Sequence, residues 1–210
     1  MPADHQYPSG PPRISRVVGR DLPRASAADA ARTLVDGATS GALSTVARDP
    51  AGYPFGSVVS YGLDERGAPL FVISALAEHT RNLTADPRAS LLVTEPDVPG
   101  TDPLARGRVT LIGDATPVPD AEQDAATALV ATRVPAVAGY AGYGDFRCFR
   151  LAVRAIRWVG GFGEMDWVAA DAYAGADVDA VLPHRNDIAA HMNDDVRRLV
   201  VELVHAARAR

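Results

Sequence analysis

The stretch SALAEHTRNLTADPRASLLV, residues 74–93, is the most informative part of this chain. It joins the end of one expected strand, a short polar helix and the start of the next strand. A strand end followed by a helix start leaves backbone N–H groups unpaired. Here they lie beside the hydroxyls of Ser74 and Thr80 and the guanidinium of Arg81. This combination is typical of a pocket for an anionic cofactor.

A second interpretation of the same stretch stays open. Short polar crossovers are common on protein surfaces, and in such a crossover Arg81 would pair only with a nearby carboxylate. His79 would then cap its helix or pair with Glu78 or Asp86.

Composition excludes several functional classes. All 21 basic residues are arginine, so chemistry that needs a lysine amine, such as a Schiff base, is excluded. Arginine binds carboxylates and phosphates through two parallel hydrogen bonds, which keeps cofactors with propionate or phosphate groups open. A net charge of -5 argues against nucleic acid or an anionic membrane surface as a partner.

The N-terminus and the single cysteine indicate the compartment. Residues 1–10 are polar and contain proline, unlike a signal sequence, and no apolar run is long enough to span a bilayer. Cys148 cannot form an internal disulfide and is expected to be a buried, small hydrophobic residue. We therefore expect a cytoplasmic protein of ordinary globular type, because 47% hydrophobic residues suffice for a core.

The order of elements predicts a mainly β protein with flanking helices. Ser26 is the expected N-cap of a helix that ends near Ser40-Gly41. Asp120 is the expected N-cap of a second helix, which extends to about Arg133. β-branched and alternating residues predict strands over 42–48, 55–62, 69–74, 89–94, 108–116, 146–153 and 156–161. About seven strands joined mostly by short turns describe a small antiparallel barrel better than a doubly wound sheet.

The chain ends differ in composition from this central part. Residues 1–24 are rich in Pro, Gly and Arg and are expected to form an extended arm. Residues 25–170 would form the barrel domain, and 171–210 a linker and a C-terminal helix. That helix would carry Leu199, Val200, Leu203 and Val204 on one face. We expect this face to pack on the barrel or on a second subunit.

Several spaced motifs resemble the FMN-binding split barrels related to pyridoxamine phosphate oxidase, and more narrowly their heme-utilisation, HugZ-like branch. The resemblance covers roughly residues 26–192. It implies an antiparallel split barrel, an obligate homodimer and a ligand site at the subunit interface. The motifs are GALSTV (41–46), GYPFGS (52–57), HTRNL (79–83), RGRVT (106–110), GDFRCFRL (144–151) and GGFG (160–163).

For the heme branch, the resemblance implies particular residues. Arg108 matches the arginine of the strand after the long loop, and Asp145 matches the aspartate of the Asp-Phe-x-x-Phe-Arg-Leu motif. The axial histidine of the family lies about 20 residues after the Gly-Phe-Gly turn, which corresponds to His184, with Arg185 as its basic neighbour. Asp145 would orient the imidazole, while Arg108 and Arg185 would neutralise the heme propionates. Judged without the resemblance, His184 sits beside Pro183 in a polar stretch and is interpreted as an exposed loop histidine.

For the flavin relatives, the resemblance implies a different use of the opening stretch. Arg81, Thr80 and Ser74 would then hold the phosphate of FMN. A single arginine in this segment counts against that alternative, and the fold counts for it.

His191-Met-Asn-Asp194 resembles the start of a helical module that often follows the barrel. The second histidine of that module is missing, and the chain ends at Arg210, so the module is truncated here. We interpret His191 as a helix-surface residue.

Three functions are consistent with the sequence. The first is a dimeric heme-binding protein that degrades heme with an external electron donor, with His184 as the iron ligand. The second is an FMN-dependent oxidoreductase. The third is a heme carrier or heme-sensing regulator without catalysis.

Overall fold

The computed structural model describes residues 25–161, 163–184, 187–188 and 190–198. Eight strands form one sheet in which every pairing is antiparallel. The strands are β1 (Ser40–Val46), β2 (Pro54–Ser60), β3 (Gly62–Leu63), β4 (Pro69–Ser74), β5 (Arg88–Thr94), β6 (Arg108–Pro117), β7 (Phe146–Gly161) and β8 (Glu164–Ala169). Their order is β2-β1-β5-β6-β7-β4-β3, and β8 pairs with β7.

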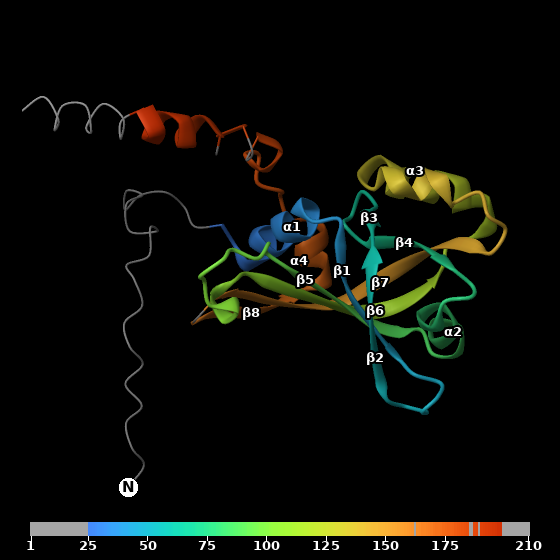
Figure 1. Ribbon diagram of the computed structural model, residues 1–210. Coiled ribbons are helices and arrows are strands. Elements are labelled where there is room, and N and C mark those ends of the chain that lie inside the picture. Colours follow the sequence, from blue (N-terminus) through green and yellow to red (C-terminus); the bar gives the residue numbers. More distant parts are fainter. Residues whose placement is uncertain (1–24, 162, 185–186, 189, 199–210) are drawn as a thin grey trace, which may run out of the picture.

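Four α-helices flank the sheet: α1 (Ala27–Gly37), α2 (Glu78–Ala85), α3 (Gln123–Arg133) and α4 (Ala170–Ala174). Figure 1 shows the sheet curling into a half-barrel, with α1 and α4 toward one end and α2 and α3 toward the other. The loops between these elements contain short 3-10 turns: η2 (Pro103–Ala105), η3 (Asp120–Glu122), η4 (Pro135–Gly139) and η5 (Leu182–His184). The predicted fold class, an antiparallel split barrel with flanking helices, is confirmed.

The core follows from strand alternation, because successive side chains point to opposite faces of a sheet. In β5 the residues Ala89, Leu91 and Val93 point inward, and in β6 Val109 and Leu111 do the same; all five are buried. Helix α1 packs against this inner face with Ala31 and Val35. Its predicted N-cap is confirmed, since the Asp29 amide donates to Ser26 Oγ at 3.0 Å.

The long strand β7 organises the molecule, and it differs from the prediction. The expected strands over 146–153 and 156–161 are one strand of 16 residues, which pairs with β6 and also with both β4 and β8. A register shift between Ile112 and Gly113 accommodates the curvature. A side chain at Gly113 would lie 2.1 Å from the Ala152 carbonyl oxygen, so glycine is needed there.

Other differences from the prediction are local. Asp120 belongs to the 3-10 turn η3 and pairs with Arg147, and α3 begins only at Gln123. Strand β8 was not expected. Residues 171–174, at the start of the expected linker, belong to α4, where the buried Tyr173 hydroxyl donates to the Gly67 carbonyl at 3.1 Å. Cys148 is buried as expected, and burial raises the pKa of its thiol to about 11.

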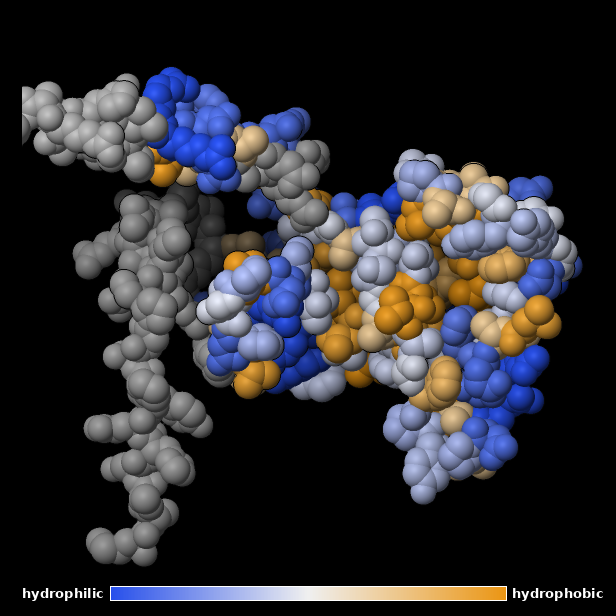
Figure 2. All heavy atoms as spheres, viewed as in Figure 1, coloured by the Kyte–Doolittle hydropathy of each residue, from blue (hydrophilic) through white to orange (hydrophobic). Residues whose placement is uncertain are grey.

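The outer face of the sheet exposes apolar side chains. Register places Val58, Leu92 and Trp167 in one row across the face, and Ile112 in the next row. All four are exposed, with 81% of Val58 and 60% of Trp167 accessible. Figure 2 shows apolar residues gathered across the middle of the viewed face, where β1 and β2 cross in Figure 1. Soluble monomers rarely keep a large apolar patch exposed, so this face is suited to an interface.

The helical residues 187–188 and 190–198 stand clear of the sheet in Figure 1. The described helical residues 187–188 and 190–198 expose Ile188, Met192 and Val196 at helical spacing. The expected apolar face of Leu199, Val200, Leu203 and Val204 lies outside the described residues. None of the described helices combines the length and apolar character needed to cross a bilayer.

Candidate functional site

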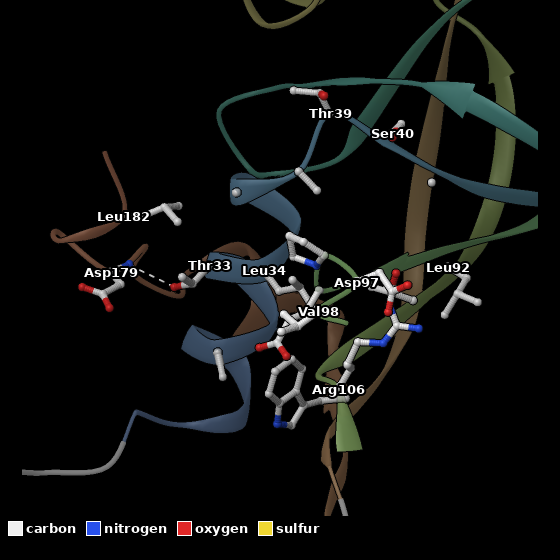
Figure 3. Close-up of a pocket in the computed structure, with 18 of the residues that line it drawn as sticks. Thr33, Leu34, Thr39, Ser40, Leu92, Asp97, Val98, Arg106, Asp179 and Leu182 are labelled. Carbon is white, nitrogen blue, oxygen red and sulfur yellow. Dashed lines mark hydrogen bonds and ion pairs between the residues drawn. The ribbon is translucent and has the colours of Figure 1, made fainter. Parts of the chain in front are cut away.

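The larger cavity is a groove between α1, the start of β1, the end of β5 and the loop over 95–106 (Figure 3). Its volume is about 1570 Å³. Much of its wall is apolar, with Leu34 from α1, Val58 and Leu92 from the outer sheet face, Val98 from the loop and Leu182 from η5. A groove of this size exceeds the usual 300–1,000 Å³ of ligand sites, so it has room for a large, mostly apolar ligand.

Charged side chains line both walls of the groove. Arg106 is the sole basic residue among the described residues that line it, and six lining residues are acidic: Asp29, Glu95, Asp97, Asp102, Asp177 and Asp179. Arg106 Nη1 lies 3.3 Å from Asp97 Oδ1. Its Nε is buried and has no hydrogen-bond partner among the described residues. The groove therefore offers one guanidinium with unused donor capacity.

Arg108, a predicted site residue, lies at the base of the same loop. Its side chain is on the outer face of β6, since Val109 and Leu111 alternate inward. Its Nη1 donates to the carbonyl oxygens of Leu104 and Arg106, at 3.2 and 3.3 Å. Arg108 thus holds the end of the loop that forms one wall of the groove.

His184, the predicted iron ligand, lies in η5 at the other wall. The segment before it is fixed on α1, because the Asp177 amide donates to Asp29 Oδ1 at 3.1 Å and the Asp179 amide to Thr33 Oγ1 at 3.0 Å (the latter drawn in Figure 3). The His184 side chain is exposed, two residues after Leu182, which lines the groove. Arg185 lies outside the described residues.

The other predicted site residues lie at the opposite end of the sheet. Ser74 Oγ donates to Asp145 Oδ2 at 2.5 Å and accepts from the Leu76 amide at 3.0 Å. Asp145 and Thr80 line a second cavity of about 270 Å³ together with Arg147. Thr80 is only 5% exposed, and its hydroxyl has no partner among the described residues. The structure therefore brings Ser74, Thr80 and Asp145 together, around a space too small for a porphyrin.

Arg81 does not join this cavity. Its guanidinium is half-exposed and lies 3.7 Å from Glu78 Oε2, and Glu78 also lies 3.6 Å from Arg48. This is the carboxylate pairing that the sequence left open. Because Arg147 is paired with Asp120 and Asp145 brings its own negative charge, the small cavity is poorly suited to a phosphate dianion.

His79 is turned toward the neighbouring strand β2. Its Nδ1 lies 3.2 Å from Ser57 Oγ, while its Nε2 is buried and has no hydrogen-bond partner among the described residues. Burial lowers the pKa of this imidazole. The charged groups beside it belong to the network of Arg48, Glu78 and Arg81. We infer a neutral, structural histidine that joins α2 to β2.

This burial predicts a pH dependence of stability. Well above 6.5, the ordinary pKa of histidine, His79 is neutral in both the folded and the unfolded state, and its contribution to stability is complete. As the pH falls below 6.5, the unfolded chain takes up the proton before the folded one, so the free energy of unfolding declines until the lowered pKa is passed. One proton limits this slope to ~1.4 kcal/mol per pH unit. The measurement is urea unfolding of wild type and His79→Gln at pH 7.5 and 5.5.

His79→Gln is the matched comparison because glutamine is neutral throughout that range and can still bond to Ser57. The variant is expected to lose part of the acid-side decline shown by wild type. Equal declines in both proteins would contradict the assignment.

Within one chain, Ser74, Thr80 and Asp145 lie far from Arg108 and His184. Arg108 pairs with Val159 near one end of β7, whereas Asp145 directly precedes Phe146 at the other end. At about 3.3 Å per residue, these ends are roughly 40 Å apart along the strand. The segment that leads to His184 is fixed on α1, near the Arg108 end. The structure therefore does not bring Asp145 and His184 of one chain together.

Two site features were not predicted from the sequence. The first is that Arg106 lines the groove. Arg106 stands two positions before Arg108, and the sequence Arg-Gly-Arg does not show which of the two side chains enters the groove. Buried Asn82 fixes α2 to β1, since its Oδ1 accepts from the Arg48 amide and its Nδ2 donates to Thr45 Oγ1, both at 3.1 Å. Because Asn82 is a polar residue within a polar helix, its burial could not be predicted from the sequence.

Residues 22–175 match the family described as CREG, beta-barrel. The chain is 32% identical over 188 residues to the non-canonical heme oxygenase HOZ, chloroplastic, of Arabidopsis thaliana, an alignment that covers 87% of this chain and 56% of that protein. It thus spans little more than half the length of this curated relative.

Solved structures agree with the family match. A heme binding protein from Mycobacterium smegmatis is 42% identical, with a TM-score of 0.73 over 83% of this chain and 70% of that one. A protein of unknown function from Agrobacterium tumefaciens is 26% identical, with a TM-score of 0.61 over 70% and 59%. The chain therefore belongs to the CREG β-barrel family, and the resemblance to the heme-utilisation branch of the split barrels is confirmed.

Proposed function

We propose that this protein binds heme in the groove between α1 and the loop over 95–106. The observation that carries the proposal is the groove itself, which combines apolar walls, a guanidinium with unused donors and a nearby exposed imidazole. Heme needs these three features, because it is a flat, mostly apolar disc with two carboxylates and an iron. The similarity to the mycobacterial heme binding protein supports it.

In this proposal His184 supplies the axial nitrogen, and its exposure leaves the imidazole accessible. Arginines neutralise the propionates: Arg106 lines the groove from the loop side, and Arg185 follows His184 in the sequence. Asp145 accepts a hydrogen bond from the other imidazole nitrogen and so fixes the orientation of the ring. Only one oxygen of Asp145 is used by Ser74, which leaves the other for this bond.

We further propose that the functional unit is a homodimer formed through the outer sheet face. A two-fold axis that lies in the plane of this interface, perpendicular to the strands, would reverse the strand direction. It would therefore place the Asp145 end of one chain beside the His184 and Arg108 end of the other. Each heme site would then be composite, with the apolar face of Val58, Ile112 and Trp167 buried between the chains.

The FMN alternative has weaker support. Its phosphate would lie at Ser74, Thr80 and Arg81, where Asp145 adds a carboxylate and Arg81 is held by Glu78. Transfer of a phosphate group from water into such a site is unfavourable unless an unpaired cationic side chain is present there.

We propose heme degradation as the activity, supported by the 32% identity to a heme oxygenase. Bound heme supplies the redox and dioxygen chemistry, and an external electron donor is required. The chain contributes the imidazole of His184, the apolar walls that exclude water and the arginines that set the orientation. A carrier without catalysis is the competing outcome.

The test is titration of the purified full-length protein with hemin, with FMN in parallel. A Soret shift that saturates at one heme per subunit is the expected result. Tight FMN binding without a specific Soret band would overturn the proposal. Addition of reductant and oxygen, with catalase present to remove hydrogen peroxide, should then bleach the Soret band; a persistent band would establish the carrier instead.

A further inference from the structure

The two arginines of the Arg-Gly-Arg sequence at the end of the loop over 95–106 differ in what they bind. Arg108 does not line the groove, and its Nη1 donates to two backbone carbonyls of the loop. Arg106 is held by a single ion pair and keeps a buried, unpartnered Nε. Burying a guanidinium N–H without an acceptor is costly, so the Arg106 site is incomplete as it stands.

The partner of Arg106 is weakly held. The Asp97 side chain is 78% exposed, against 24% for Arg106. An ion pair with one solvent-exposed member contributes little to stability, because water competes for the carboxylate. Figure 3 shows the Arg106 side chain reaching this carboxylate inside the groove. Asp97 therefore occupies the one guanidinium that a carboxylate-bearing ligand would use there.

We propose that Arg106, and not Arg108, binds a carboxylate of the ligand in the groove, and that Asp97 competes with the ligand for it. This inference rests on the proposed heme function and specifies how the groove recognises a propionate. Arg108 is a positioning residue that holds the loop from which Arg106 projects. Because a guanidinium can bind a carboxylate bidentately, exchange of Asp97 for a propionate would also supply an acceptor for Nε.

The experiment compares two probes that differ only in their carboxylates, hemin and hemin dimethyl ester, on full-length protein. Arg106→Gln should weaken hemin binding by roughly tenfold to a hundredfold, the value of a charge-assisted hydrogen-bonded pair. It should leave binding of the dimethyl ester nearly unchanged. Asp97→Asn, a change at an exposed position, should strengthen hemin binding and leave the ester unaffected.

Arg108→Gln is the matched control, because it should weaken both probes to a similar extent through the loop. Equal losses of hemin and ester in Arg106→Gln would overturn the inference, as would hemin affinity that is unchanged or lower in Asp97→Asn. Failure of the underlying function has a different signature, in which the wild-type protein binds neither probe.

Discussion

Replacing His184 with alanine is expected to abolish the histidine-ligated heme spectrum of the protein. The imidazole is the proposed axial ligand, and without it the iron has only water or a weak ligand on that side. His184 is exposed and makes no side-chain hydrogen bond among the described residues, so the change should alter the free energy of unfolding by less than ~0.5 kcal/mol. Loss of the spectrum could then be attributed to ligation and not to unfolding. Absorption and resonance Raman spectra of the hemin complex provide the measurement.

Two comparisons make this result specific. Added imidazole should restore a nitrogen-ligated spectrum to His184→Ala, because the cavity left behind admits a free ligand. His191→Ala is the matched control: its side chain is also exposed and lies 3.5 Å from Asp195, so its loss should leave the spectrum unchanged. A His184→Ala spectrum identical to wild type would remove His184 from the site.

The strands of this fold were predictable because their pattern is local. Ala89, Leu91 and Val93 alternate with polar or exposed positions, and that alternation depends only on which face is buried. The continuity of β7 was not predictable in this way. Its middle carries Arg154 beside Ala155, which interrupts the apolar pattern, but β6 pairs with both halves and makes one strand of them.

The candidate site was predictable only as a set of residues. Motif order identified Asp145, Arg108 and His184, but sequence spacing contains no information on which end of a sheet a residue reaches. The structure separates Asp145 from Arg108 along β7 and commits Arg108 to the loop backbone. Arg106 emerges only when the groove is present, because its distinguishing feature is a buried donor without an acceptor.

The second large effect is expected for Ile112→Asp, at the middle of the outer sheet face. Ile112 does not line the groove, yet the change would bury two unpaired carboxylates, one from each copy, in the proposed interface. At about 3 kcal/mol for each charge, the dimer Kd would rise by roughly ten-thousandfold. The variant should therefore be monomeric by analytical ultracentrifugation and, because each proposed site is composite, should also lose heme affinity. Leu129→Asp, at an exposed position on α3, is the control and should remain dimeric and heme-binding.

Subunit mixing separates a composite site from a dimer that merely stabilises each chain. In a dimer of one His184→Ala chain and one Asp145→Asn chain, a composite arrangement places both substitutions in one site and leaves the other with intact His184 and Asp145. Mixed dimers should therefore recover about half of the wild-type Soret signal, with the wild-type iron–histidine stretching frequency. If both residues acted within one chain, every site in the mixture would carry a substitution, and no wild-type signal would return. That outcome, or a monomeric wild-type protein that binds heme with full affinity, would contradict the two-fold arrangement.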